Sequence, residues 1–186
     1  MEKPGEKLLQ YLNCFGILSC NVNPFLPALP DIGCAWEDVA ALIDARELFY
    51  CKAWRGRTVY LSREAYRLMK ACRAARPSTP EADRLYGMLS GGPPLGTDEL
   101  KRLAGLDPKA YAKGFQRLLE DMRVTALKNG RPLNPSWSTF LYGTAEAWER
   151  LAGTEPCGLR PEEARERLRA LLGPTVPDRE FARLVR

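Results

Sequence analysis

The sequence contains no histidine, and this absence excludes the side chain that most often acts as a general base near neutral pH. Histidine-assisted serine or cysteine nucleophiles are excluded for the same reason. The six cysteines form no CxxC pair, so we expect no zinc site and no cofactor, only small apolar thiols in a reducing cytosol. No apolar run is long enough to span a membrane, and the polar start does not resemble a signal peptide. These absences predict a cytoplasmic protein without a membrane partner.

Positive charge is abundant but unevenly placed. The net charge is +5, yet residues 46–76 alone hold nine Lys or Arg against two Glu, which gives this segment a charge of +7. A basic block inside an otherwise balanced chain is the electrostatic footprint of a polyanion partner, although a solvated helix face would look similar. The block becomes informative only together with the fold around it.

A predicted hairpin lies inside this basic block. Residues 47–61 (ELFYCKAWRGRTVYL) alternate apolar and polar side chains on either side of the turn Arg55-Gly56-Arg57. Helical spacing of apolar residues precedes the hairpin and also follows it, where Ser62 is the expected N-cap. The sequence thus predicts a first unit, residues 1–76, that includes the proline-rich loop NVNPFLPALPDIG.

A second unit of the same kind is predicted at residues 80–153. It contains three helices, of which the second is capped by Thr97 and the third by Asp107, and then a hairpin that turns at Asn129-Gly130. Three helices followed by a two-stranded hairpin is the element order of a winged helix-turn-helix. The expected fold class is therefore α+β and mostly helical, with tandem winged helix-turn-helix units.

The tail, residues 159–186, repeats part of this pattern. Its LRALLGPTVPDREFARLVR and the earlier LYGMLSGGPPLGTDELKRLAG both read as a helix, a Gly-Pro break, an acidic cap and a second helix. We expect the tail to form a partial third repeat, the opening two helices of another unit. Because an orphan helix pair cannot bury its own apolar face, we expect it to pack on the second unit or to form a homodimer.

The candidate contacts to nucleic acid are basic and polar side chains on the predicted wings and on the long helix that follows Asp107. They are Lys52, Arg55, Arg57, Lys109, Lys113, Gln116, Arg117, Lys128 and Arg131. Arginines at a wing tip can neutralise phosphates or enter a minor groove, and a recognition helix can lie in the major groove. Two alternatives stay open: the wing cations could only keep an edge hairpin soluble, and Glu120 and Asp121 could make the helix a ladder of paired charges.

Three stretches of the chain resemble the AlkZ-type winged-helix DNA glycosylases, which unhook crosslinks and remove alkylated purines. They are LNCFGILSCNVNPFLPALPDIG, RELFYCKAWRGRTVYLSREAYRLM and RALLGPTVPDREFARL. The resemblance implies tandem winged helices and double-stranded DNA as the partner. It also implies a C-terminal β-barrel, for which this sequence has no counterpart.

The catalytic pattern of those glycosylases is not matched. Where they carry Gln-x-Gln or Gln-x-Asp after the glycine of the first turn, this chain has Ser19 and Asn21. Asn21 could orient a water molecule, but Ser19 cannot mimic the first glutamine, and a histidine common near the following Leu-Pro is absent. We therefore expect a truncated, non-catalytic relative that binds DNA. A divergent glycosylase that uses Asn21 on alkylated bases and a winged-helix protein-interaction module are the alternatives.

Overall fold

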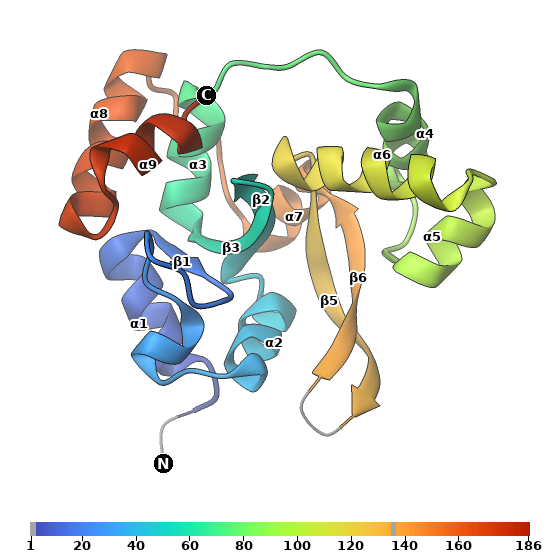
Figure 1. Cartoon of the computed structure of the whole chain (residues 1–186), viewed down its shortest axis with the longest axis horizontal. Coiled ribbons are helices and arrows are strands. Elements are labelled where there is room, and N and C mark those ends of the chain that lie inside the picture. Colours follow the sequence, from blue (N-terminus) through green and yellow to red (C-terminus); the bar gives the residue numbers. More distant parts are fainter. Residues whose placement is uncertain (1–2, 135–136) are drawn as a thin grey trace.

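The computed structural model describes residues 3–134 and 137–186 and is an α+β structure, with helices around two small sheets (Figure 1). The helices are α1 (Glu6–Phe15), α2 (Trp36–Ala45), α3 (Arg63–Cys72), α4 (Pro80–Leu89), α5 (Thr97–Ala104), α6 (Pro108–Glu120), α7 (Ala145–Ala152), α8 (Pro161–Leu172) and α9 (Asp178–Leu184), with short 3-10 helices η1 (Leu29–Ile32) and η2 (Gly173–Thr175). The strands are β1 (Ile17–Ser19), β2 (Leu48–Trp54), β3 (Arg57–Ser62), β4 (Leu95–Gly96), β5 (Val124–Asn134) and β6 (Trp137–Thr144).

Each sheet has three antiparallel strands, in the orders β1-β3-β2 and β4-β6-β5. The sequence predicts both hairpins, β2–β3 and β5–β6, and the structure confirms them. The short strands β1 and β4, of 3 and 2 residues, are additions that the sequence pattern does not reveal. Each pairs with the second strand of its hairpin, so β2 and β5 lie at the sheet edges opposite the short strands.

Local capping chemistry fixes several helix starts. The Ser62 hydroxyl accepts a hydrogen bond from the Ala65 amide at 3.1 Å, which confirms this residue as the N-cap of α3. Asp107 caps α6 in the same way and precedes a proline at the first helical position. The prediction for Thr97 was wrong by one residue: Gly96 is the N-cap and Thr97 is already helical, because β4 runs directly into α5.

The predicted turn at Asn129-Gly130 is also wrong, because β5 continues through it to Asn134. Asn129 pairs with Phe140, and the register shifts between Asn129 and Pro132, so the Asn-Gly pair marks an irregularity within the strand. A Cβ atom at Gly130 would lie 2.5 Å from the Thr139 Oγ1. The glycine is therefore needed for the close approach of β6, and Lys128 and Arg131 lie along β5 instead of flanking a turn.

The two sheets meet edge to edge through one threonine. The Thr125 hydroxyl on β5 accepts a hydrogen bond from the Tyr50 amide at 3.0 Å and donates one to the Tyr50 carbonyl at 2.8 Å. Thr125 is 0% exposed, so water cannot replace these bonds. Beside this joint each helix packs on a strand of the other sheet: α2, which precedes the first hairpin, packs against β5, and α6, which precedes the second hairpin, packs against β2.

The tail packs on the first part of the chain, which corrects the expectation that it would cover the second unit. Figure 1 shows α8 beside α3, and α8 packs against α3 and α1 while α9 packs against β2. Leu168 and Leu172 of α8 are fully buried in a cluster with residues of β2, β3 and α3. A Cβ atom at Gly16 would approach the Leu172 side chain to 2.9 Å. The apolar face of the tail is thus covered within the chain, and a homodimer stays a prediction.

Among the described residues, no helix is long and apolar enough to cross a membrane.

The Thr125→Val substitution tests the joint between the sheets. We expect it to lower the free energy of unfolding by about 2 kcal/mol, because the buried Tyr50 amide and carbonyl lose their partner while the shape is kept. Thr139→Val is the matched control: its hydroxyl likewise bonds the amide and carbonyl of one residue, Arg131, but that residue is exposed, so water can take the place of the hydroxyl. Urea unfolding measures both, and equal effects would contradict the assigned role of Thr125.

Candidate nucleic-acid interface

A pocket of about 260 Å³ lies beside the turn of the β2–β3 hairpin and is lined mainly by cations. We call it the basic pocket. Its charged lining residues are Lys52, Arg55, Arg73, Arg76, Arg183 and Arg186, with Glu120 as the one acidic residue. They come from β2, the hairpin turn, the segment after α3, the end of α6 and the tail, so five separate parts of the chain converge there.

The turn itself consists of Arg55 and Gly56, with Trp54 paired to Arg57 across it. Both turn residues have positive φ, 51° and 66°, as a type I′ hairpin turn requires. An arginine in this region costs of order 1 kcal/mol, so its position needs a compensating interaction. Gly56 also allows a close approach, because its carbonyl accepts a hydrogen bond from the Gln116 amide nitrogen of α6 at 3.0 Å.

Glu180 of α9 provides the compensation for Arg55. Its carboxylate accepts hydrogen bonds from the Arg55 Nε at 2.8 Å, the Arg55 Nη2 at 2.7 Å and the Trp54 indole nitrogen at 2.8 Å. These interactions, led by the Arg55 hydrogen bonds, lower the pKa of Glu180 to about 2 although burial opposes them. Glu180 is 1% exposed. Arg55, predicted as a DNA contact, is thus held by a buried anion and adds little net charge to the pocket.

Two other cations of the pocket donate their hydrogen bonds to an uncharged side chain or to main-chain oxygens. Lys52 donates a hydrogen bond to the neutral Gln116 side chain at 2.8 Å. Arg73 donates to the main-chain oxygens of Glu120 and Arg186, at 3.0 and 3.2 Å. Within residues 3–134 and 137–186, neither of these two cations has a carboxylate in an ion pair. Burial is the main effect that lowers the pKa of the Arg73 guanidinium, and Arg76 adds to it, while Cys51 and Asp121 act in the opposite direction. An anion placed here would favour the charged guanidinium.

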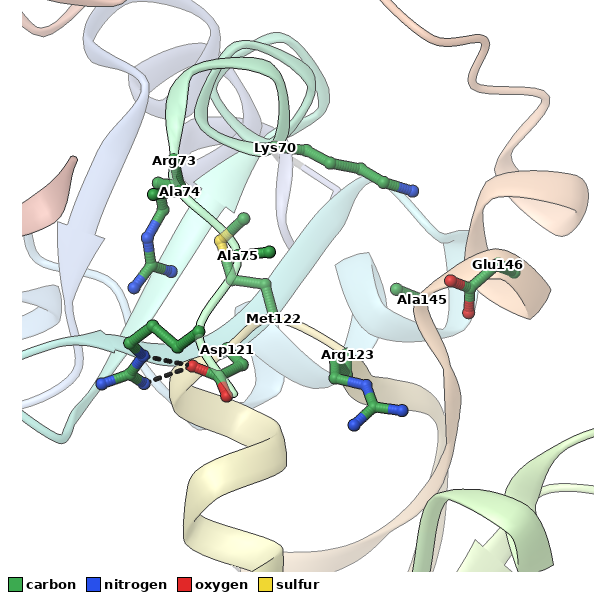
Figure 2. Close-up of a pocket in the computed structure, with 10 residues that line it drawn as sticks. Lys70, Arg73, Ala74, Ala75, Asp121, Met122, Arg123, Ala145 and Glu146 are labelled. Atoms are coloured by element: carbon green, nitrogen blue, oxygen red, sulfur yellow. Dashed lines mark hydrogen bonds and ion pairs between the residues drawn. The ribbon is translucent and has the colours of Figure 1, made fainter. Parts of the chain in front are cut away.

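A second pocket, of about 220 Å³, continues the positive surface. It shares Arg73 and Arg76 with the basic pocket, and Figure 2 shows the side chains of Lys70 and Arg123 beside it. Its acids limit the charge, since Asp121 pairs with Arg76 and also lies 2.5 Å from the Arg117 Nε. The net positive region is therefore centred on the basic pocket.

The residues predicted on the long helix divide into two groups. Lys109 and Lys113 are exposed, with the Lys113 ammonium 4.0 Å from Glu81. Gln116 and Arg117 are engaged inside the protein: Gln116 bonds Lys52 and Gly56, and Arg117 bonds Asp121 and the Pro77 carbonyl. Because α6 packs on β2, the C-terminal half of this helix is covered, and it does not offer one continuous open face.

The remaining predicted residues lie apart from the basic pocket lining. Arg57 and Lys128 are exposed, and Arg131 is 3.9 Å from Asp98 with a side chain that is 73% exposed. Asn21 is exposed too, and its main-chain oxygen accepts a hydrogen bond from the buried Ser19 hydroxyl at 3.0 Å. The Ser19 side chain is therefore already used within the loop.

Sequence reasoning did not single out four members of the pocket. Arg73 and Arg76 belong to the basic block of residues 46–76, so charge counting includes them without distinguishing them. Arg183 and Arg186 lie in the tail, where the sequence pattern gives no indication of a site. In the described part of the chain no cluster of three or more potential metal-binding side chains is present.

Comparison with known proteins gives one result. A family model described as AlkZ related matches residues 31–186. This range contains both hairpins, the basic pocket and the tail, and it begins after the segment with Ser19 and Asn21. No curated protein and no solved structure matches the chain.

Glu180→Gln tests the ionic lock between the tail and the hairpin turn. We expect it to lower the free energy of unfolding by about 2 kcal/mol at neutral pH, because the buried anion that satisfies Arg55 and Trp54 is lost. The folded state lowers the pKa of this carboxyl, so its stabilisation is complete above the ordinary pKa near 4.5. It is lost as the pH falls from about 5 toward 2.

The difference between wild type and Glu180→Gln should therefore shrink across that pH window in denaturant titrations. Glu163→Gln serves as the control, because its partner Arg160 is exposed and the pair contributes little at any pH. A difference for Glu180→Gln that stays constant down to pH 2 would contradict the lock.

Proposed function

The chain belongs to the AlkZ-related family, which relates it to DNA-repair glycosylase-like proteins, and on this premise we propose that it binds double-stranded DNA without removing bases. The observation that carries the proposal is the basic pocket. Cations from four segments of the chain gather there, and Lys52 and Arg73 bond an uncharged side chain and main-chain oxygens instead of an acidic side chain. Phosphate oxygens are the natural complement of such a surface.

The proposal includes two winged-helix units, at residues 1–76 and 80–153, with the tail at 159–186 as the start of a third. The first unit has the order helix, short strand, 3-10 helix, helix, two-stranded hairpin, and the second has helix, short strand, two helices, two-stranded hairpin. The short strand pairs with the last strand of the hairpin in both sheets, and this arrangement supports the assignment. The hairpin turn at Arg55 would then be the wing of the first unit.

Contact with the DNA backbone fits the structure better than base reading in the major groove. The helix α6 is covered by β2 along its C-terminal half, so only Lys109 and Lys113 near its start remain exposed among its predicted contacts. Phosphate contacts position a protein on DNA and carry no sequence information. We therefore propose binding of low sequence specificity that depends on charge.

The absence of glycosylase activity rests on the segment after α1. The family match begins at residue 31, beyond Ser19 and Asn21. The Ser19 hydroxyl bonds the Asn21 main-chain oxygen and the side chain is 2% exposed, so it is unavailable to hold a water molecule or a sugar cation. Release of a base from alkylated DNA by the purified protein would overturn this part of the proposal.

The salt dependence of DNA binding tests the interface. Four phosphate contacts, from Lys52, Arg73 and Arg186 of the basic pocket and from the exposed Arg57 beside its turn, predict a slope of roughly −4 in log affinity against log salt concentration. Lys52→Gln should weaken binding several-fold and reduce the steepness of that slope by about 1, since one phosphate contact is lost. Fluorescence anisotropy with a labelled duplex at several salt concentrations measures both quantities.

Lys7→Gln provides the matched control, because it removes the same charge from an exposed position on α1. It should leave the slope unchanged. Equal losses for the two variants would show that total charge, and not this pocket, drives association. A complex insensitive to salt, or no complex with duplex DNA at all, would refute the proposal.

A further inference from the structure

The basic pocket is a small hollow that cations reach from several sides. Its volume is about 260 Å³, which is below the range of about 300–1,000 Å³ that is usual for the pockets of drug-sized ligands. Lys52 comes from β2, Arg73 from the segment after α3 and Arg186 from the tail, so three separate parts of the chain bring positive charge to it. A group that fits this pocket is therefore small and anionic.

Part of the positive charge around the pocket is already paired. Glu120, the one acid of the lining, lies 3.6 Å from the Arg76 guanidinium. The carboxylate of Glu180 is 2.7 Å from Arg55 and 3.7 Å from Arg183. In the described part of the chain, the cations of the lining that have no ion pair with an acidic side chain are Lys52, Arg73 and Arg186. More than one positive charge is thus available to an entering anion.

Lys52 and Arg73 also keep hydrogen-bond donors for a ligand. An ammonium has three N–H donors, and Lys52 uses one of them on the Gln116 side chain. A guanidinium has five, and Arg73 uses one on each of two main-chain oxygens. In Figure 2 no hydrogen bond or ion pair joins Arg73 to Asp121 or Glu146, the two acids drawn there. The remaining donors can serve the oxygens of one bound group.

The two kinds of phosphate ester differ in charge and in the number of their free oxygens. A phosphodiester, the internal link of a nucleic-acid strand, has one negative charge and two unsubstituted oxygens. A phosphomonoester has a charge of about −1.5 to −2 near neutral pH and three acceptor oxygens. Because Coulomb attraction grows with the charge of the ligand, several unpaired cations favour the monoester. The monoester also has a single substituent, so it can enter a hollow end first.

We infer that the basic pocket binds a phosphomonoester, held by Lys52 and Arg73, in preference to a phosphodiester. The monoester belongs either to a free nucleotide or similar small phosphate, or to the end of a nucleic-acid strand. The second source deepens the proposed function and rests on it, whereas the first does not. The planar guanidinium of Arg73 suits two oxygens of one phosphate, and the Lys52 ammonium acts as a point charge beside it.

Two nucleotides with the same base test the preference. Adenosine 5′-monophosphate is a monoester, and adenosine 3′,5′-cyclic monophosphate is a diester of nearly the same size. We expect the monoester to bind the full chain at least about tenfold more tightly, because it forms additional charge-assisted hydrogen bonds. Isothermal titration calorimetry at one fixed ionic strength measures both affinities.

A duplex closed by a loop at each end separates a strand end from internal phosphates. It is prepared without a nick, with one nick that has a 5′-phosphate, and with the same nick that has a 5′-hydroxyl. If a strand end is the source, the phosphorylated nick should bind at least about tenfold more tightly than the other two forms in fluorescence anisotropy. Equal binding of the three forms, together with selective binding of the free monoester, identifies a small phosphate as the ligand.

Three substitutions locate the site. Lys52→Gln and Arg73→Gln each remove one cation and should each weaken binding of the monoester about tenfold or more. Arg84→Gln is the control, because it removes an exposed arginine on α4 that does not line the pocket, and it should leave the preference unchanged. If the half-buried Arg73 is needed for folding, Lys52→Gln decides the question alone.

The outcomes distinguish this inference from the proposed function. No difference between the two nucleotides, together with no difference among the three duplexes, would overturn the inference and leave the proposed function intact. A preference for the monoester that survives unchanged in Lys52→Gln would also overturn it, since the ligand would then bind elsewhere. Selective binding of the free monoester without binding of any duplex would instead uphold the inference and refute the proposed function.

Discussion

The meeting of two sheet edges at Thr125 is the constraint on which the other features depend. A free strand edge exposes unpaired amides and carbonyls, and burying it without partners is costly. Here the edges of β2 and β5 face one another, and one buried hydroxyl satisfies both main-chain groups of Tyr50. Once β2 and β5 are held together, α2 must pass over β5 and α6 over β2. The basic pocket lies where the β2–β3 hairpin contacts α6.

The same crossing decides how the charge is distributed. Strand β2 covers part of α6, and Gln116 of this helix bonds both Lys52 and Gly56. The helix α6 therefore loses part of its exposed face, and the Lys52 side chain is held in a fixed position beside it. The tail completes the arrangement, since Glu180 neutralises the strained Arg55 and brings Arg183 to the same pocket. The hairpin turn that the sequence marks as basic is therefore partly a docking point for the tail.

Local patterns in the sequence predict the local structure well and the long-range structure poorly. Ser62 and Asp107 were recognisable as caps, and the β2–β3 hairpin followed from alternation around its turn. The β5–β6 hairpin was predicted from an Asn-Gly pair that lies inside β5. The strands β1 and β4 are too short to show a period, and Gly130 looked like a turn residue although its role is to admit Thr139. Arg55 and Glu180 are 125 positions apart, so no local pattern could reveal their contact or the pocket it helps to form.

The strand β2 links the joint between the sheets to the basic pocket. Tyr50, whose main-chain groups bond Thr125, and Lys52, which lines the pocket, are two residues apart on this strand. The register of β2 shifts between Cys51 and Trp54, so Lys52 lies in the irregular part of the strand, where its ammonium donates a hydrogen bond to Gln116 of α6. Because Thr125 holds Tyr50 and Gln116 bonds both Lys52 and Gly56, this end of the strand is fixed from both sides and the cation of the pocket is fixed with it.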